Sequence, residues 1–224
     1  METQEIEEWG EKLTQDVCQH WETWKNDYSF SKSGFAVFYS RPRLNPDLLI
    51  LGFNPGGDEN AFDLKRDSRL PDFHDYFQDG DGDYRLAQKM RGLFKDIDKE
   101  ETLKNSVKLN LIFFRSTDKN QWNQINRPLR QEMEKYCLSK VREVIKVLNP
   151  KVILTEGIQT FQILHANLPQ ASPPQFESIN GRRAMFAKSN FSGIPLLGII
   201  HLSGARPSEE EMQSIKKILS KELQ

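Results

Sequence analysis

The sequence contains only two cysteines, Cys18 and Cys137, and neither has a histidine or second cysteine at metal-ligand spacing. Zinc and iron–sulfur centres are therefore not expected. Long apolar runs are also missing, and the acidic N-terminus lacks the basic start and apolar stretch of a signal peptide. We expect a soluble, intracellular, cytoplasmic protein that does not associate with a membrane.

The sequence has almost no net charge, because 31 Lys and Arg balance 32 Asp and Glu to give -1. A strong overall positive field, typical of sequence-independent nucleic-acid binding, is thus excluded, and any such surface must be local. The 224 residues, 37% of them hydrophobic, can bury one large core. We predict a single domain over residues 1–224, and we expect a monomer.

Apolar residues recur at helical spacing near the N-terminus and predict a covering helix at about 3–25. Its tryptophans allow two interpretations, a base-stacking surface or core packing, and helical spacing favours core packing. Further helical patterns occupy Pro128–Leu148, Ile158–Leu164 and Ser208–Leu223.

Uninterrupted apolar runs alternate with these helical patterns. Such runs are typical of strands buried on both faces of a parallel sheet, and the alternation predicts a βαβ architecture. An additional apolar run at Phe35–Tyr39 precedes them. The main runs are Leu48–Phe53, Val107–Phe114, Val152–Leu154 and Pro195–Ile200.

Polar side chains stand at the ends of three of these runs or inside them: Asn54, Asn110 and His201. Ligands of open α/β sheets bind at the carboxyl ends of the strands, so these residues are site candidates. Taken singly, Asn54 fits an ordinary Asn-Pro-Gly turn, His201 a structural histidine, and Asn110 an edge or bulge. Their joint occurrence on three strands favours a common site.

The motifs around these residues resemble those of the uracil-DNA glycosylase superfamily, closest to its single-strand-selective and mismatch-specific branches. Leu51–Gly56 is similar to the first motif, and His201–Pro207 to the second, usually His-Pro-Ser followed by a loop that wedges into DNA. Asn110–Ser116 resembles the intervening strand that reads the pyrimidine, and Val152–Gly157 resembles a later strand ending in glycine. The resemblance begins at Leu48.

This resemblance implies a three-layer α/β/α fold with a central, mostly parallel four-stranded sheet. It implies a monofunctional DNA glycosylase that removes uracil or a related deaminated base from a flipped nucleotide, with DNA as partner and no metal or organic cofactor. Asn54 would hold the attacking water, Asn110 would pair with the base edge, and His201 would donate to the pyrimidine oxygen. The implied base-binding phenylalanines are Phe62, then Phe73, together with Phe53, and the implied phosphate or DNA contacts are Gly56, Gly57, Arg115, Ser203, Gly204 and Arg206.

Two departures from the family pattern affect the expected activity. Leu202 stands where the family has proline, and Asn54 replaces the aspartate of the most active branch, so it orients water but cannot act as a general base. Asp58 and Glu59 next to the first motif would repel DNA unless they turn away. The candidate phosphate contacts form a thin basic surface of Arg115, Arg127, Arg130, Arg182, Arg183 and Arg206.

Two other functions stay open. The fold can serve as a catalytically weak or inactive binder of a nucleobase, nucleotide or nucleic acid, which the near-neutral charge and Leu202 favour. A small-molecule enzyme that holds a phosphate at the Gly56-Gly57 turn ranks last, because neither a Gly-x-Gly-x-x-Gly series nor a Walker lysine is present.

Overall fold

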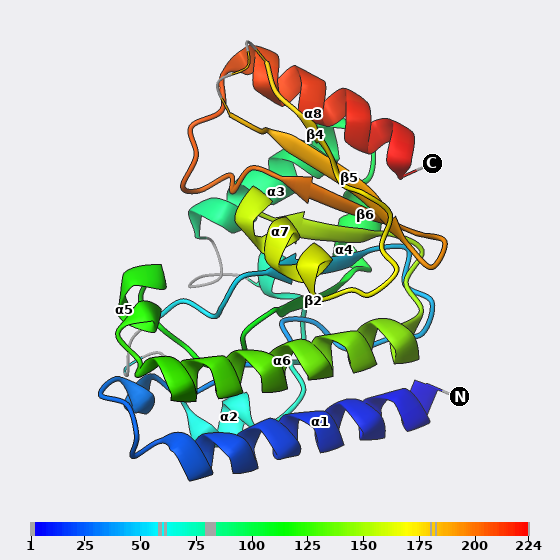
Figure 1. Cartoon of the computed structure of the whole chain (residues 1–224). Coiled ribbons are helices and arrows are strands. Elements are labelled where there is room, and N and C mark those ends of the chain that lie inside the picture. The colour runs from blue at the N-terminus through cyan, green and yellow to red at the C-terminus, as the bar shows by residue number, and fades with distance from the viewer. Residues whose placement is uncertain are drawn as a thin grey trace.

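A central six-stranded sheet lies between two layers of helices in the computed structural model of the chain (Figure 1). The structure describes residues 3–57, 60, 62–78, 84–179, 181 and 183–223. The strand order is β2-β1-β3-β6-β5-β4. The α/β class and the mostly parallel central sheet predicted from the sequence are therefore present, but the sheet has two strands more than the predicted four.

The four parallel strands are those that the apolar runs predict. They are β1 (Leu49–Gly52), β2 (Val107–Asn110), β3 (Ile153–Glu156) and β6 (Ile194–Ile199). Strand β1 pairs with β2 on one side and β3 on the other, and β3 pairs with β6. All four carboxyl ends therefore lie along one edge of the sheet.

Two antiparallel strands, β5 (Phe186–Phe191) and β4 (Gln175–Glu177), extend the sheet beyond β6. The apolar-run criterion overlooks β5 because polar residues interrupt it, and β4 is exposed along its whole length. The apolar run Phe35–Tyr39 forms no full strand and touches β2 and the segment after it through isolated bridges at Phe35 and Phe38.

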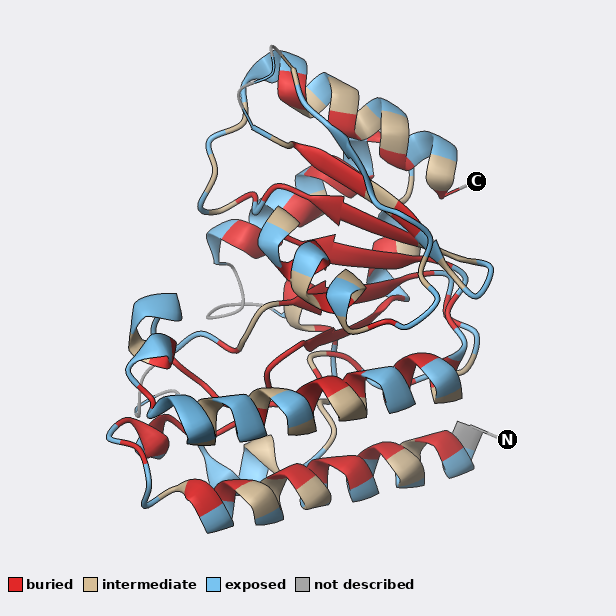
Figure 2. Cartoon of the chain, in the orientation of Figure 1, coloured by how far each residue is buried: buried red, intermediate tan, exposed pale blue. Residues whose placement is uncertain are grey.

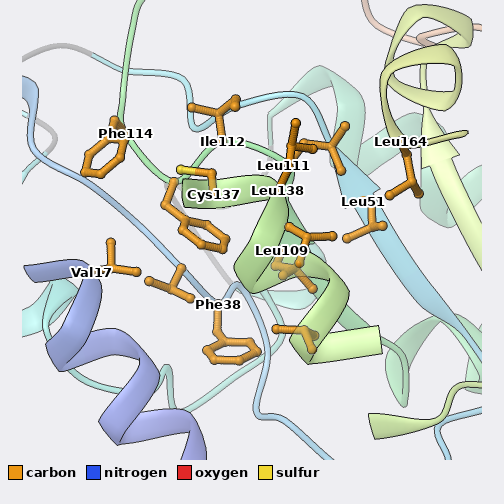
Figure 3. Close-up of a cluster of buried hydrophobic side chains, with 14 of the residues drawn as sticks. Val17, Phe38, Leu51, Leu109, Leu111, Ile112, Phe114, Cys137, Leu138 and Leu164 are labelled. Carbon is orange, nitrogen blue, oxygen red and sulfur yellow. The ribbon is translucent and has the colours of Figure 1, made fainter. Parts of the chain in front are cut away.

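Alternate residues of the strands divide the core between the two helical layers. Leu49 and Leu51 pack toward α1 (Thr3–Trp24), α6 (Arg127–Leu148) and α7 (Ile158–Ala166). Leu48 and Ile50 pack toward α3 (Arg85–Asp96), α4 (Glu100–Lys104) and α8 (Glu209–Glu222). Figure 2 shows the resulting burial of the parallel strands, and Figure 3 shows Cys137 and Leu138 of α6 in the same buried cluster as Leu109 of β2.

Helix α1 lies along α6 on the outside of the first layer (Figure 1). Its Trp21 and Trp24 are buried, with the Trp21 indole donating to the Ser31 carbonyl at 2.9 Å. Trp24 packs edge-on against Phe114. These two tryptophans therefore belong to the core, as their helical spacing predicts, and do not form a stacking surface.

Short elements complete the described chain: η1 (Ser31–Ser33), α2 (Leu64–Asp67), η3 (Asp75–Phe77) and α5 (Lys119–Asn123). Ser208 caps α8 in a capping box with Glu211, which satisfies two otherwise unpaired amides. Over the described residues, no helix combines the length and apolar character needed to cross a bilayer. Asp58, Glu59 and Arg182 lie outside the described residues.

Candidate functional site

A cleft of about 1820 Å³ runs along the carboxyl ends of the parallel strands. Its walls come from the loops that follow β1, β2 and β6, from the start of α7, and from the segment between α2 and η3. Helix α5 lies off this edge of the sheet (Figure 1). The volume of the cleft exceeds the roughly 300–1,000 Å³ of an ordinary small-ligand pocket, so the cleft has room for more than an isolated base.

The structure brings Asn54, Asn110 and His201 to this one cleft. Asn54 follows β1, Asn110 ends β2, and His201 follows β6. In the strand order, β1 and β3 separate Asn110 from His201, which is three strand spacings or roughly 14 Å along the sheet edge. The two side chains thus stand at opposite ends of a shared floor, with Asn54 between them.

The amide of Asn54 is held in one orientation. Its Nδ2 donates to the Pro55 carbonyl at 3.0 Å and to Ser116 Oγ at 2.8 Å. A carbonyl oxygen only accepts, and the Ser116 hydroxyl itself donates to the Asp118 carbonyl, so the nitrogen must face these partners. Within the described chain nothing donates to Asn54 Oδ1, which leaves this oxygen as an acceptor for a ligand or a water.

His201 is exposed in the cleft, and its Nδ1 lies 3.1 Å from Ser203 Oγ. Desolvation by the cleft walls, followed by the positive charge of Lys108, lowers the pKa of His201. The imidazole is therefore neutral at neutral pH. In the tautomer in which the Ser203 hydroxyl donates to Nδ1, Nε2 carries the hydrogen and is a donor toward the cleft.

Gly52 forms the floor between Asn110 and Glu156. A Cβ atom at position 52 would lie 2.1 Å from Asn110 Oδ1 and 3.4 Å from Glu156 Oε2. Both side chains therefore lean over Gly52 from the neighbouring strands β2 and β3. We call the part of the cleft lined by Gly52 and these two side chains the Gly52 slot. Only glycine leaves room for the Asn110 oxygen at this place.

A buried polar network lies beside the Gly52 slot. Glu156 is 3% exposed and accepts a short hydrogen bond from the Tyr76 hydroxyl. Lys108 is also buried, and its Nζ donates to Asp75 Oδ2 at 3.2 Å and sits 4.4 Å from the centre of the Tyr76 ring. Burial lowers the pKa of Lys108, and the Asp75 carboxylate opposes this effect. Neither Glu156 nor Lys108 was identified as a site candidate from the sequence. For Glu156, a carboxylate residue at the end of an apolar strand is a signal in the sequence that could have identified it.

The predicted stacking residues separate into two groups. Phe62 packs against Trp21 and Phe35, with ring centroids 5.1 and 5.5 Å away, and it does not line the cleft. Its ring also fills the space over Gly34, which has a positive φ. The structure therefore places the leading stacking candidate in the hydrophobic core, whereas Phe53 and the 67% exposed Phe73 line the cleft.

The candidate phosphate contacts are likewise divided. Arg115 is buried and donates to the Gly56 carbonyl at 2.8 Å, so it braces the loop after β1. Arg183 is paired with Glu211, and Arg130 bonds the Asn123 carbonyl at 3.0 Å. Arg127 and Arg206 are exposed but lie away from the cleft lining.

Other basic residues, not predicted from the sequence, line the cleft. Lys65, Arg66 and Arg69 come from α2 and the turn after it, and Lys119 opens α5. Lys119 lies 5.7 Å from the centre of the Phe53 ring. The occurrence of three basic residues within five positions of the sequence, 65–69, is the sequence signal for the first three. Acidic residues share the cleft: Asp63, Asp67, Asp72, Asp75, Asp118 and Glu156.

The loop after β6 is anchored by Leu202, whose side chain is buried in the second core cluster. Hydrogen bonds from the Gly204 and Ala205 amides to the His201 carbonyl, at 3.2 and 2.8 Å, close this turn. Packing thus supplies a restraint at the position where the family has proline. Ser203 lines the cleft with His201, whereas Gly204 lies just behind the ring, its Cβ position 3.7 Å from His201 Nδ1.

The neutral imidazole of His74 holds η3 in place beside the cleft through hydrogen bonds. Its Nδ1 accepts the Tyr76 amide at 3.2 Å, and its Nε2 lies 2.9 Å from Ser106 Oγ, which donates to the Leu103 carbonyl. Nε2 must therefore donate and Nδ1 accept. Burial, together with Lys108, lowers the pKa of His74 from 6.5 to about 4. Protonation would remove the bond that fixes Tyr76.

We expect this histidine to make the protein sensitive to acid. Below pH 6.5 the unfolded chain binds a proton that the folded His74 refuses until about pH 4, so the free energy of unfolding falls across this window. The loss attributable to His74 is about 3 kcal/mol at 1.36 kcal/mol per pKa unit. Denaturant titrations at several pH values measure it.

His74→Asn provides the comparison, because an Asn oxygen can accept the amide two residues later without titrating. The variant should show a shallower fall in unfolding free energy than the wild type. Equal slopes for the two proteins would contradict the assignment to His74.

No protein-family model matches this chain, and no curated protein matches it. Within the residues that the structure describes, no group of three or more His, Cys, Asp or Glu side chains is arranged to hold a metal ion.

Proposed function

We propose that the protein is a DNA glycosylase that removes uracil or a related deaminated base from a flipped nucleotide. The observation that carries this proposal is the meeting of Asn54, Asn110 and His201, from three different strands, in one cleft at the carboxyl edge of the sheet. A base inside a duplex is out of reach of such a cleft, so the nucleotide has to enter it unstacked.

The chemistry follows from the orientation of the side chains. A water held by Asn54 Oδ1 attacks C1′ of the sugar, the bond from C1′ to the base nitrogen breaks, and its electron pair leaves with the base. Since the Asn54 amide cannot accept a proton, the proton that the water loses passes through solvent to the base anion. His201 donates a hydrogen bond to the base oxygen on which negative charge builds, and Asn110 pairs with the base edge. A neutral imidazole with a fixed orientation stabilises this charge without reorganising.

The size and rim of the cleft support a nucleic-acid substrate. About 1820 Å³ gives room for a base, its sugar and neighbouring groups. The exposed Lys65 and Arg69 stand on one wall and supply positive charge of the kind that phosphates require, whereas the Arg66 guanidinium on the same wall is paired with the Asp67 carboxylate. The acidic residues of the same cleft keep this charge local, so we expect weak binding to DNA that lacks a target base.

Replacement of Asn54 tests the proposal. We expect wild-type protein to release free base from a uracil-containing single-stranded oligonucleotide, and Asn54→Ala to release it about 100-fold more slowly because the water is no longer oriented. The rate is measured by chromatography of the freed base under single-turnover conditions.

Asn26→Ala is the matched control, since Asn26 is exposed in the turn after α1 and does not line the cleft. It should release base at the wild-type rate. A wild-type rate for Asn54→Ala would remove Asn54 from the mechanism, and absence of base release by the wild type would contradict the glycosylase proposal.

The second candidate is a catalytically weak or inactive binder of a nucleobase or nucleotide. The specific observation in its favour is that residue 54 is an asparagine whose side-chain amide is hydrogen-bonded to Ser116 and to the Pro55 carbonyl. No general base therefore acts on the water from this position. Saturable binding without base release, unchanged in Asn54→Ala, is the expected result for this function. The phosphate-binding enzyme has less support, because the first described α-helix after Gly57 is α2, which has four residues.

A further inference from the structure

Glu156 offers a second polar group to the cleft beside Asn110. The residue ends β3 and lines the cleft, although its side chain is almost fully buried. Its two oxygens have different surroundings: Oε1 accepts from the Tyr76 hydroxyl, while Oε2 lies over Gly52. Among the described residues Oε2 has no hydrogen-bond partner. Because Oε2 is not one of the fully buried polar atoms that lack a partner in the described chain, and Glu156 lines the cleft, this oxygen is open to the cleft, where a ligand or water can pair with it.

The groups around Glu156 determine its protonation state. Asp75 and Tyr76 face it from η3, Lys108 approaches from β2 and is paired with Asp75, and His201 lies beside Gly157. Burial, and to a smaller extent the negative charge of Asp75, raise the pKa of Glu156 to about 8. At neutral pH the carboxyl is therefore an acid with one O–H donor, unlike an ordinary glutamate.

The position of this donor defines what fits in the Gly52 slot. Oε1 is occupied by Tyr76, so the hydrogen of the neutral acid belongs on Oε2, which faces the slot. A ligand group opposite Oε2 must then be an acceptor. A ring carbonyl satisfies this donor, whereas an exocyclic amino group at the same place would set donor against donor and leave both unpaired.

We propose that Glu156 is a base-recognition residue whose Oε2 donates a hydrogen bond to a ring carbonyl of a base seated over the Gly52 slot, with Asn110 beside Glu156 and facing the same edge of the base. The ligand class is a base with a carbonyl on the edge facing Glu156, as deamination produces from an amino base. This inference rests on the proposed function only in that a base occupies the cleft; it does not require that the glycosidic bond is cleaved.

The affinity of the full-length protein for free uracil and for free cytosine, measured by calorimetry, tests this inference. We expect the wild type to prefer uracil at about pH 6.5 and to lose about ten-fold in uracil affinity toward about pH 9, as the donor becomes a carboxylate. Cytosine affinity should not fall over the same range, because a carboxylate accepts from its amino group.

Two variants separate recognition from a structural role. Glu156→Gln keeps an acceptor for Tyr76 and an N–H donor for the ligand, so its uracil affinity should stay close to that of the wild type at about pH 6.5 and become independent of pH. Glu156→Ala should bind uracil about ten-fold more weakly, and its unfolding transition shows whether the fold survives. Recovery in Glu156→Gln of affinity lost in Glu156→Ala excludes a merely structural effect.

The two proposals fail in different ways. Unchanged uracil affinity in Glu156→Ala, a flat pH profile in the wild type, or no detectable uracil binding would each overturn the role of Glu156. Base release from the oligonucleotide by the same preparation would still support the glycosylase. Uracil binding with the expected pH profile but without base release would support Glu156 recognition and reject the glycosylase.

Discussion

Gly52→Ala is expected to eliminate base binding and base release while the protein still folds. The new Cβ would lie 2.1 Å from Asn110 Oδ1, closer than real Cβ contacts allow, so the Asn110 side chain must turn out of the Gly52 slot. The methyl group itself would occupy the slot. Overpacking of this kind costs about 1–3 kcal/mol of stability. Uracil titration by calorimetry and a denaturant curve measure the two effects separately.

The matched substitution is Gly92→Ala. Gly92 is exposed in α3, and nothing lies within 4 Å of its Cβ position. Since alanine favours a helix over glycine, this variant should be up to about 1 kcal/mol more stable and should bind uracil normally. Wild-type binding by a folded Gly52→Ala protein would show that the base does not enter the Gly52 slot.

The parallel part of the sheet could be predicted because burial on both faces leaves a continuous apolar run. Leu48–Phe53 and Pro195–Ile200 have this pattern and become β1 and β6. The pattern fails for β5, which lies near the edge of the sheet and carries Lys188 and Asn190. A strand with mixed faces is stabilised by its partner, here the β5–β6 pairing, which the apolar run alone does not encode.

Side chains at strand ends were predictable for a different reason. Backbone topology alone brings the residues after β1, β2 and β6 to one edge, whatever the packing elsewhere, and Asn54, Asn110 and His201 follow this rule. The place of an aromatic ring in a long loop depends on packing instead. Phe62 turns into the core because Gly34 and Trp21 leave room for its ring there.

The Glu156 site could not be derived from local sequence. Its burial and its raised pKa depend on Tyr76 and Asp75, which approach from η3, about 80 residues earlier in the chain. Gly52 is equally uninformative in the sequence, because glycine at a strand end usually signals a turn. Its role as the floor of a slot appears only when β2 and β3 flank it.

His201→Ala is expected to slow base release by about 10²–10³-fold, because the variant has no donor for the charge that develops on the departing base. Uracil affinity should fall much less, since the ground-state base carries no net charge. The single-turnover rate and the calorimetric affinity, measured on the same preparation, distinguish these effects. The lowered pKa of His201 further predicts that titration of this residue leaves the wild-type rate unchanged near neutral pH and affects it only on acidification below the usual histidine range.

Three comparisons make this result specific to the position. His201→Gln retains an N–H donor, so it should recover part of the lost rate, and His20→Ala should release base normally because His20 lies between α1 and α6, stacked on Tyr136. Ser203→Ala should have a smaller effect, as it removes the hydroxyl that lies 3.1 Å from Nδ1 but leaves the ring in place. If His201→Ala lowers affinity and rate equally, the imidazole binds the base but does not stabilise the transition state, and leaving-group stabilisation must come from Glu156 or from the backbone amides of the cleft.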